Sequence, residues 1–280
     1  MNIKDLCVHD AVQIKWPDTT WPYVTEQIKK KFHTSRGKTL FINAVEDIFF
    51  FDVRGFNKKF SPVPEIFQSY DSWVGVSHQH KQFLSDEKHD WSYFEQSMHR
   101  CKCLITLSQY MKEYWLDKFP DLNVVNLLHP APKRQHVFDL DKFRNNKVIR
   151  CIGTWGRDYK IWNQLETIYD KQSSRDNYLS REQFDLTFVN TINFLDVQDA
   201  SANNAVIECI QRNTPILVRK HPAVIEYLGD DYPLYFESLE HANMLISNID
   251  YTIAAHKYLQ RMNKRHVQIE TFLHDFSEIN

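Results

Sequence analysis

Glycine is scarce in this sequence, with 6 residues in a chain of 280, against roughly 7% in an average protein. The six glycines form neither a G-x-G-x-x-G sequence nor a G-x-x-x-x-G-K sequence. These two patterns supply the turns that hold phosphates in dinucleotide-binding and P-loop proteins. Their absence argues against nicotinamide dehydrogenases and P-loop nucleotidases.

Paired cysteines and long apolar runs are also lacking. The chain has 5 cysteines, an odd number at irregular spacing, and no C-x-x-C pair. This usage argues against a disulfide framework and against a structural zinc site. No apolar run approaches the ~18 residues of a membrane span, and the first residues lack the apolar core of a signal peptide. We therefore expect a cytoplasmic protein with reduced thiols and no transmembrane segment.

The near-neutral net charge excludes no class of ligand, but it does not favour binding to nucleic acid. There are 34 basic and 36 acidic residues, for a net charge of −2. A protein that coats nucleic acid needs a basic surface to neutralise phosphates. We therefore do not expect a nucleic-acid partner. Apolar residues make up 42% of the chain, which is typical of a globular protein.

Short apolar runs, rich in β-branched and aromatic residues, alternate with helical patterns along the chain. Such runs indicate buried strands, and their alternation with helices indicates parallel sheets. The predicted strands are 39–45, 48–52, 73–77, 103–107, 124–128, 148–153, 184–189 and 215–219. The predicted helices are 23–32, 109–119, 159–170, 203–213, 222–228 and 238–248, with one or two more after 249.

A polar stretch near 130–147 divides this pattern into two similar halves. We expect two Rossmann-like α/β domains, 1–135 and 136–280, the second with terminal helices. Two such domains facing each other would hold a ligand in the cleft between them, at the carboxyl ends of the strands.

The start of the predicted helix 203–213 is the most informative place in the sequence. Asn203 is a good N-cap and Asn204 begins the first turn. The free N–H groups and the positive end of the helix dipole at this position suit an anion such as diphosphate. Glu208 projects from the same face as Asn204, where its carboxylate could accept hydrogen bonds from ribose hydroxyls. The alternative is a solvated glutamate on an amphipathic helix.

Two segments here resemble the donor-binding half of the GT-B-fold glycosyltransferases. In that family a helix carries a glutamate and is followed by a short turn, a Thr-Pro pair and a buried strand, as in NNAVIECIQRNTPILV (203–218). HPAVIEYLG (221–229) resembles the next segment, a helix under the donor sugar. The resemblance implies that Glu208 binds the nucleotide ribose. Many retaining members carry a further glutamate eight residues earlier, where this chain has Ala200 beside Asp199. Either that carboxylate is absent here, or its role passes to Asp199 or to the pair Asn203 and Asn204. The donor sugar therefore stays open.

A third segment, IRCIGTWGRDYK (149–160), resembles the opening strand and loop of the same domain. The resemblance implies a turn at Gly153, with Arg157 and Lys160 neutralising the diphosphate. Cations placed there stabilise the charge that develops on the leaving group, so the reaction would need no metal and no cofactor besides the donor. The alternative is an exposed loop with ordinary surface charges.

The first half of the chain resembles the acceptor domain of this fold, although it is shorter than is usual for the family. WVGVSHQH (73–80) ends a predicted strand with histidines. His78 or His80 could orient a substrate hydroxyl or act as a base, since histidine titrates near neutral pH. The alternative is a polar strand end. Ser108 is the expected cap of the helix that follows the next strand.

The sequence therefore predicts a hexosyltransferase-like enzyme. It would move a sugar from a nucleotide-diphosphate donor to a glycan, lipid or protein acceptor without a metal, and the resemblance favours retention of configuration. One alternative is a protein of the same fold that binds nucleotide or glycan without turnover. Ala200 and the short first half favour that alternative.

A second alternative is a metal-dependent phosphohydrolase. His78 and His80 lie two residues apart on one strand, and Glu46, Asp47 or Asp52 could complete a metal site. The D-x-D sequence at 139–141 formally matches a manganese-binding motif. Because it lies in the polar stretch between the domains, we expect a solvated turn there instead.

Overall fold

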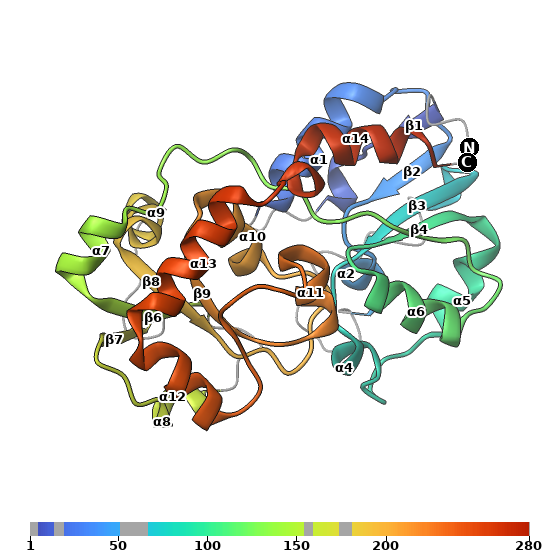
Figure 1. Cartoon of the computed structure of the whole chain (residues 1–280). Helices are drawn as coiled ribbons and strands as arrows, with labels where there is room; N and C mark the ends of the chain where they lie inside the picture. The colour runs from blue at the N-terminus through green and yellow to red at the C-terminus, as the bar shows by residue number, and fades with distance from the viewer. Residues whose placement is uncertain (1–4, 14–19, 51–66, 154–158, 174–180, 280) are drawn as a thin grey trace. The chain divides into compact units, whose positions relative to one another are not determined.

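The chain forms two α/β units, each built on one parallel sheet (Figure 1). The computed structural model describes residues 5–13, 20–50, 67–153, 159–173 and 181–279. The first unit comprises Met1–Ala131 with Val267–Asn280, and the second comprises Pro132–His266. Each contains a parallel sheet of five strands, so the predicted fold class is confirmed. The boundary between the units lies at 131/132, where 135/136 was expected, and the last helix belongs to the first unit, where the second was expected.

The sheet of the first unit follows the order of the chain, β1-β2-β3-β4-β5. Its strands are β1 (Leu6–Cys7), β2 (Thr39–Ile42), β3 (Ser72–Ser77), β4 (Cys101–Thr106) and β5 (Val124–Asn126). Its helices are α1 (Trp21–Phe32), α2 (Val45–Phe49), α4 (Lys81–Leu84), α5 (Ser92–Ser97), α6 (Gln109–Lys118) and α14 (Ile269–Ser277), with short 3₁₀ turns at Asp10–Val12 and Met98–Arg100.

Aromatic side chains fill the core of the first unit. Phe49, Phe94 and Trp115 lie within one buried cluster, and the rings of Phe49 and Phe94 meet edge to face at 5.2 Å. Helix α2 packs so closely on β3 that a Cβ atom at Gly75 would lie 2.3 Å from a methyl group of Val45. Only glycine therefore fits at position 75 with this packing.

The end of the chain returns to the first unit, where α14 packs against α1. The rings of Trp21 and Phe272 are 6.0 Å apart, and those of Phe32 and Phe276 are 5.2 Å apart. Burial of these aromatic faces holds the last helix to the first unit, because apolar area removed from water is the main source of stability.

The sheet of the second unit has the order β10-β9-β8-β6-β7. Its strands are β6 (Val148–Cys151), β7 (Asp170–Ser173), β8 (Thr191–Leu195), β9 (Ile216–Arg219) and β10 (Tyr235–Phe236). Its helices are α7 (Leu140–Asn146), α8 (Lys160–Gln164), α9 (Arg181–Asn190), α10 (Asn204–Arg212), α11 (Pro222–Leu228), α12 (Leu239–Ser247) and α13 (Ile249–Arg261), and a 3₁₀ turn follows at Arg265–Val267.

Several predicted elements are wrong in type or length. The apolar run 184–189 lies in α9, and the strand is the next segment, β8. Phe184 and Phe188 are four residues apart, and their rings lie 5.2 Å apart on one side of that helix. The run at 48–52 was expected to be a strand, but its described part, 48–50, holds the end of α2 and its C-cap.

The helix predicted at 159–170 is also wrong in length. Only 160–164 is helical, and β7 begins at residue 170. This edge strand is polar and largely exposed, so it lacks the apolar signal of a buried strand. Within the described ranges, no helix combines the length and the apolar composition that a membrane crossing needs.

Candidate functional site

The order of the second sheet changes direction between β6 and β8. From β6 the chain moves outward to β7, and then returns to β8 on the other side of β6. Strands β6 and β8 pair in parallel, with Cys151 opposite Phe194. In open α/β sheets, ligands bind beyond the carboxyl ends of the strands at this kind of switch point. The segments that follow β6 and β8 are therefore the candidate site.

Two of the three predicted residues after β6 lie in the described part of the chain. Gly153 has φ 84°, a left-handed conformation that favours glycine, and its carbonyl accepts a hydrogen bond from the Tyr159 hydroxyl at 2.8 Å. Lys160 is exposed at the first position of α8. Arg157 lies outside the described residues.

The helix predicted after β8 begins where expected. The side-chain oxygen of Asn203 accepts a hydrogen bond from the Ala205 amide at 3.0 Å, so Asn203 is the N-cap of α10. Asn204 is exposed in the first turn. The positive end of this helix therefore lies at the switch point, as an anion site requires.

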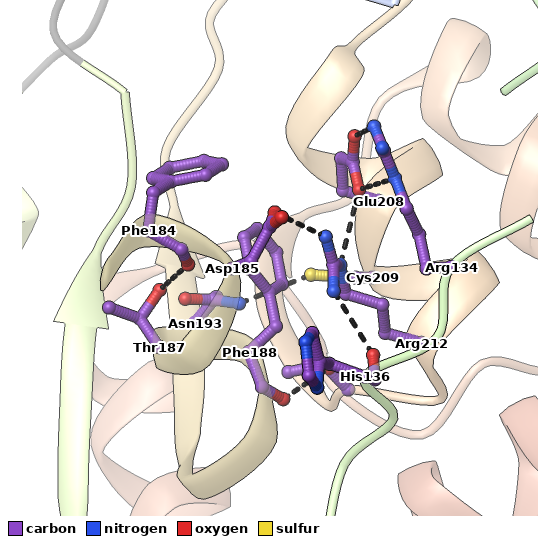
Figure 2. Close-up of polar contacts among 11 residues, drawn as sticks. Arg134, His136, Phe184, Asp185, Thr187, Phe188, Asn193, Glu208, Cys209 and Arg212 are labelled. Atoms are coloured by element: carbon purple, nitrogen blue, oxygen red, sulfur yellow. Dashed lines mark hydrogen bonds and ion pairs between the residues drawn. The ribbon is translucent and has the colours of Figure 1, made fainter. Parts of the chain in front are cut away.

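Glu208 is buried one turn inside α10, with 5% of its surface exposed. Figure 2 shows its carboxylate between two arginines. Arg134 binds it with two donors, Nε to Oε2 at 2.9 Å and Nη2 to Oε1. Arg212 Nε binds Oε2 at 3.2 Å. The alternative of a solvated glutamate is therefore wrong.

Arg212 joins three segments of the second unit and has 1% of its surface exposed. Besides Glu208, it binds the carboxylate of Asp185 on α9 at 2.6 Å and the carbonyl of His136 at 3.0 Å. Its guanidinium lies 5.0 Å from the centre of the Phe188 ring. Arg134, Arg212 and Asp185 were not predicted from the sequence as residues of the site. Of these, only Arg212 carried a signal, its spacing of four residues from Glu208.

Asp199, considered in place of a carboxylate at position 200, lies near another polar side chain. Its Oδ1 is 3.7 Å from Nε2 of His221. The other ring nitrogen of His221 accepts a hydrogen bond from the Ala223 amide at 3.2 Å and so caps α11. Ala200 is buried.

The two histidines predicted for the acceptor side follow β3 in the first unit, but they have different surroundings. His78 Nε2 lies 2.6 Å from the carbonyl of Asn43 and therefore donates to it. Its ring meets Trp21 edge to face at 4.5 Å. Burial lowers the pKa of His78 to about 3, and His129 nearby contributes. His80 caps α4, because its Nδ1 accepts from the Phe83 amide at 3.2 Å.

A buried carboxylate organises the loop that carries these histidines. Glu46 Oε1 accepts hydrogen bonds from the hydroxyl of Ser77 at 2.7 Å, the amide of His78 at 2.8 Å and the amide of Gln79 at 2.9 Å. Trp115 Nε1 in turn donates to the Ser77 hydroxyl at 3.1 Å. Burial raises the pKa of Glu46, against the opposing effect of these three donors. Glu46 therefore fixes the backbone at residues 77–79.

The metal-site alternative finds no support in the described residues. They contain no group of three or more His, Cys, Asp or Glu side chains that could hold a metal ion. The Glu46 carboxylate binds the backbone amide of His78, whereas the ring of His78 donates to a carbonyl. Asp52 lies outside the described residues.

The D-x-D sequence at 139–141 lies at the start of α7. Its first aspartate, Asp139, caps this helix by accepting hydrogen bonds from the amides of residues 141 and 142 at 3.1 Å.

Solved structures of glycosyltransferases have a similar arrangement of strands and helices. HepE of Anabaena, solved with UDP-glucose, is 10% identical over 98% of this chain and 98% of its own, with a TM-score of 0.58. WaaG, involved in lipopolysaccharide biosynthesis, is 10% identical over 93% of this chain and 84% of its own, with a TM-score of 0.56. The chain has the GT-B fold.

Some structures with this fold are longer than this chain. TarM is 11% identical over 86% of this chain, with a TM-score of 0.55, but the chain spans only 54% of TarM. No family model matches the sequence, and the search of curated proteins finds no match. At these identities, the likeness establishes the fold alone.

Proposed function

We propose that the chain is a glycosyltransferase that moves a sugar from a nucleotide-diphosphate donor to an acceptor. The observation that carries this proposal is the placement of the α10 N-terminus at the switch point of the second sheet, with Glu208 one turn inside it. HepE, which has the same fold, was solved with UDP-glucose and with UDP. In this proposal the second unit, which carries α10 and Glu208, is the donor-binding half.

Each residue of the proposed donor site has a role that follows from its position. The amides near Asn203 and Asn204 bind the diphosphate at the positive end of α10. Lys160 and Arg157, in the segment after β6, neutralise the charge on the nucleotide as it leaves. Gly153 provides the turn between β6 and that segment. Glu208 accepts a hydrogen bond from a ribose hydroxyl.

On the acceptor side, His78 and His80 bind or orient the acceptor, which is a glycan, a lipid or a protein. The Nε2–H of His78 is held by Asn43, which leaves Nδ1 as the acceptor nitrogen of the neutral ring. A pKa of about 3 keeps that ring neutral at pH 7. The reaction we propose is a hexosyl transfer with retention, without a metal or further cofactor.

One alternative is a protein that has the same binding site but does not catalyse sugar transfer. Position 200 carries a buried alanine, where many retaining GT-B enzymes carry a carboxylate. A protein of this kind would bind nucleotide or glycan and leave the donor intact.

Thermal unfolding against UDP, GDP, CDP, ADP and TDP, alone and linked to sugars, with and without chelator, tests the proposal. A ligand at 100 times its dissociation constant adds about 2.7 kcal/mol to the free energy of unfolding. We expect a shift with one nucleotide that chelator does not change, and release of that nucleotide from its sugar form when acceptors are supplied. Binding without release supports the non-catalytic alternative. No shift with any nucleotide contradicts both.

A further inference from the structure

The Glu208 carboxylate binds two arginines that differ in what else they hold. Arg212 also binds Asp185 and the His136 carbonyl, and it is almost fully buried. Arg134, in contrast, makes all of its hydrogen bonds within the described residues to Glu208. Its side chain keeps 17% of its surface exposed. Arg212 therefore ties the second unit together, whereas Arg134 acts on Glu208 alone.

The ion pair between Arg134 and Glu208 does more than neutralise the charge of the Glu208 carboxylate, because it also fixes the orientation of that group. Arg212 alone already places a cation beside Glu208, with Nε 3.2 Å from Oε2. Arg134 adds two parallel donors, Nε to Oε2 and Nη2 to Oε1. A bidentate arginine sets the plane of a carboxylate as well as its position. A glutamate that accepts a hydrogen bond from a sugar hydroxyl must hold its carboxylate in one orientation. Without such a partner, rotation about the three bonds of its side chain would give the carboxylate many orientations.

Arg134 also lies close to the boundary between the two units in the sequence. The second unit begins at Pro132, and the residues between there and α7 lead into the donor-binding half. The Arg134–Glu208 pair attaches this connecting segment to α10. The cluster is neutral overall, because Arg134 and Arg212 are balanced by Glu208 and Asp185.

We propose that Arg134 is a positioning residue of the nucleotide site, which holds the Glu208 carboxylate in the orientation that recognises ribose. The ligand class is a ribonucleoside diphosphate, and its 2′- or 3′-hydroxyl is the group that is read. This inference depends on the proposed function, since it assigns a role within the same site. It goes further in naming the residue that gives the site its preference for ribose.

The test is the ratio of affinities for a ribonucleotide and its deoxy forms. UDP, 2′-deoxy-UDP and 3′-deoxy-UDP are titrated calorimetrically into the wild-type chain, Arg134→Ala, Arg134→Lys and Arg144→Ala. If GDP, CDP or ADP gives the largest shift in unfolding temperature, it and its deoxy forms replace UDP. TDP already lacks the 2′-hydroxyl, so a largest shift with TDP would overturn the assignment of a ribonucleoside ligand. Arg144 is the control, because it forms an exposed ion pair with Asp141 at 3.0 Å in the same unit.

We expect the wild type to prefer UDP over one deoxy form by about tenfold or more, as for a hydrogen bond to a charged group. The ratio should fall to within about threefold in Arg134→Ala. Lysine offers charge without two parallel donors, so Arg134→Lys should give an intermediate ratio. Arg144→Ala should keep the wild-type ratio. Thermal unfolding of each variant without ligand shows whether the fold is retained.

The possible failures are distinguishable. If no nucleoside diphosphate binds the wild type, the proposed function is wrong. If the wild type prefers ribose and folded Arg134→Ala keeps that preference, the positioning role is wrong and the proposed function stands. If UDP binds the wild type without preference over either deoxy form, Glu208 does not read ribose and the inference fails with it. Tighter binding of UDP by Arg134→Ala would also overturn the inference, because the arginine would then occupy the place of the ribose.

Discussion

The Ser77 hydroxyl donates a hydrogen bond of 2.7 Å to Glu46 Oε1 and so joins the end of β3 to α2. Glu46 is 1% exposed, and its other oxygen, Oε2, has no hydrogen-bond partner among the described residues. Burial of a carboxylate with one oxygen unpartnered disfavours its charged form. This explains why the pKa of Glu46 is raised even though three donors favour the ionised group.

Glu46→Gln should therefore stabilise the protein at neutral pH. The folded state binds the Glu46 proton more strongly than the unfolded chain does, so stability falls as pH rises above the ordinary pKa of 4.5 and through the raised pKa. The slope reaches at most about 1.4 kcal/mol per pH unit. Glutamine keeps an acceptor oxygen and removes the charge. Urea unfolding should show a more stable variant at pH 7 and no difference below about pH 4. A variant less stable than wild type at pH 7 would contradict this.

His129 should make the first unit sensitive to acid. Its ring bonds to the Thr20 hydroxyl at 3.2 Å and to the Pro130 carbonyl at 2.7 Å, and burial lowers its pKa from 6.5 to about 4. Between these values the unfolded chain binds the proton and the folded state does not. Stability is therefore lost as pH falls through this range, by up to about 1.4 kcal/mol per pH unit.

We expect His129→Gln to reduce this dependence of stability on pH by up to the contribution of one proton, which is about 1.4 kcal/mol per pH unit. The quantity to compare is the change in unfolding free energy with pH, not its absolute value, because the variant also loses the contact of the His129 ring with Trp21 at 5.1 Å. His78 keeps part of the slope, since its pKa is also lowered. Equal slopes for variant and wild type would show that His129 does not titrate on unfolding.

Arg212→Met should strongly destabilise the second unit. The change leaves the Asp185 carboxylate without its ion pair at 2.6 Å and removes one of the two arginines at Glu208. Breaking a buried ion pair costs about 3–5 kcal/mol. The control Arg144→Met removes an exposed pair and should cost about 1 kcal/mol or less. Urea unfolding measures both, and similar losses in the two variants would argue against a structural role for Arg212.

Lys160→Ala should weaken the binding of a nucleoside diphosphate more than that of the matching nucleoside. Lys160 is exposed at the start of α8, where its ammonium group can act on phosphate but has no reason to act on the base. We expect a loss of about tenfold for the diphosphate, which corresponds to about 1.4 kcal/mol. Lys142→Ala on α7 is the control, and its loss should be small. Equal losses for diphosphate and nucleoside would remove Lys160 from the phosphate site.

The sequence alone predicted those parts of the fold that have a local physical signature. The apolar runs that became β3, β4, β6 and β9 are buried strands, and their composition indicated this. Ser108 and Asn203 cap the helices they were expected to cap, because the capping signal depends on a side chain and an amide two or three residues away.

The sequence predicted the wrong type for elements whose type depends on contacts with distant parts of the chain. The run at 184–189 is apolar enough for a strand, but Phe188 faces the core from α9, and the neighbouring segment 191–195 forms the strand. A short apolar run fits either type of element, and only the contacts of the whole sheet decide between them. Strand β7 was missed because an edge strand can stay polar.

For the candidate site, the sequence predicted that Gly153 follows β6 and that Asn203 caps the helix after β8, which carries Glu208, because strand ends and helix caps leave local signals. Tertiary structure alone decided what surrounds Glu208. Arg134 lies 74 residues before it, and Asp185 is 27 residues from Arg212. Neither pairing leaves a local pattern in the sequence. The charge state and orientation of a buried carboxylate depend on the groups that folding brings to it, and those groups come from distant parts of the chain.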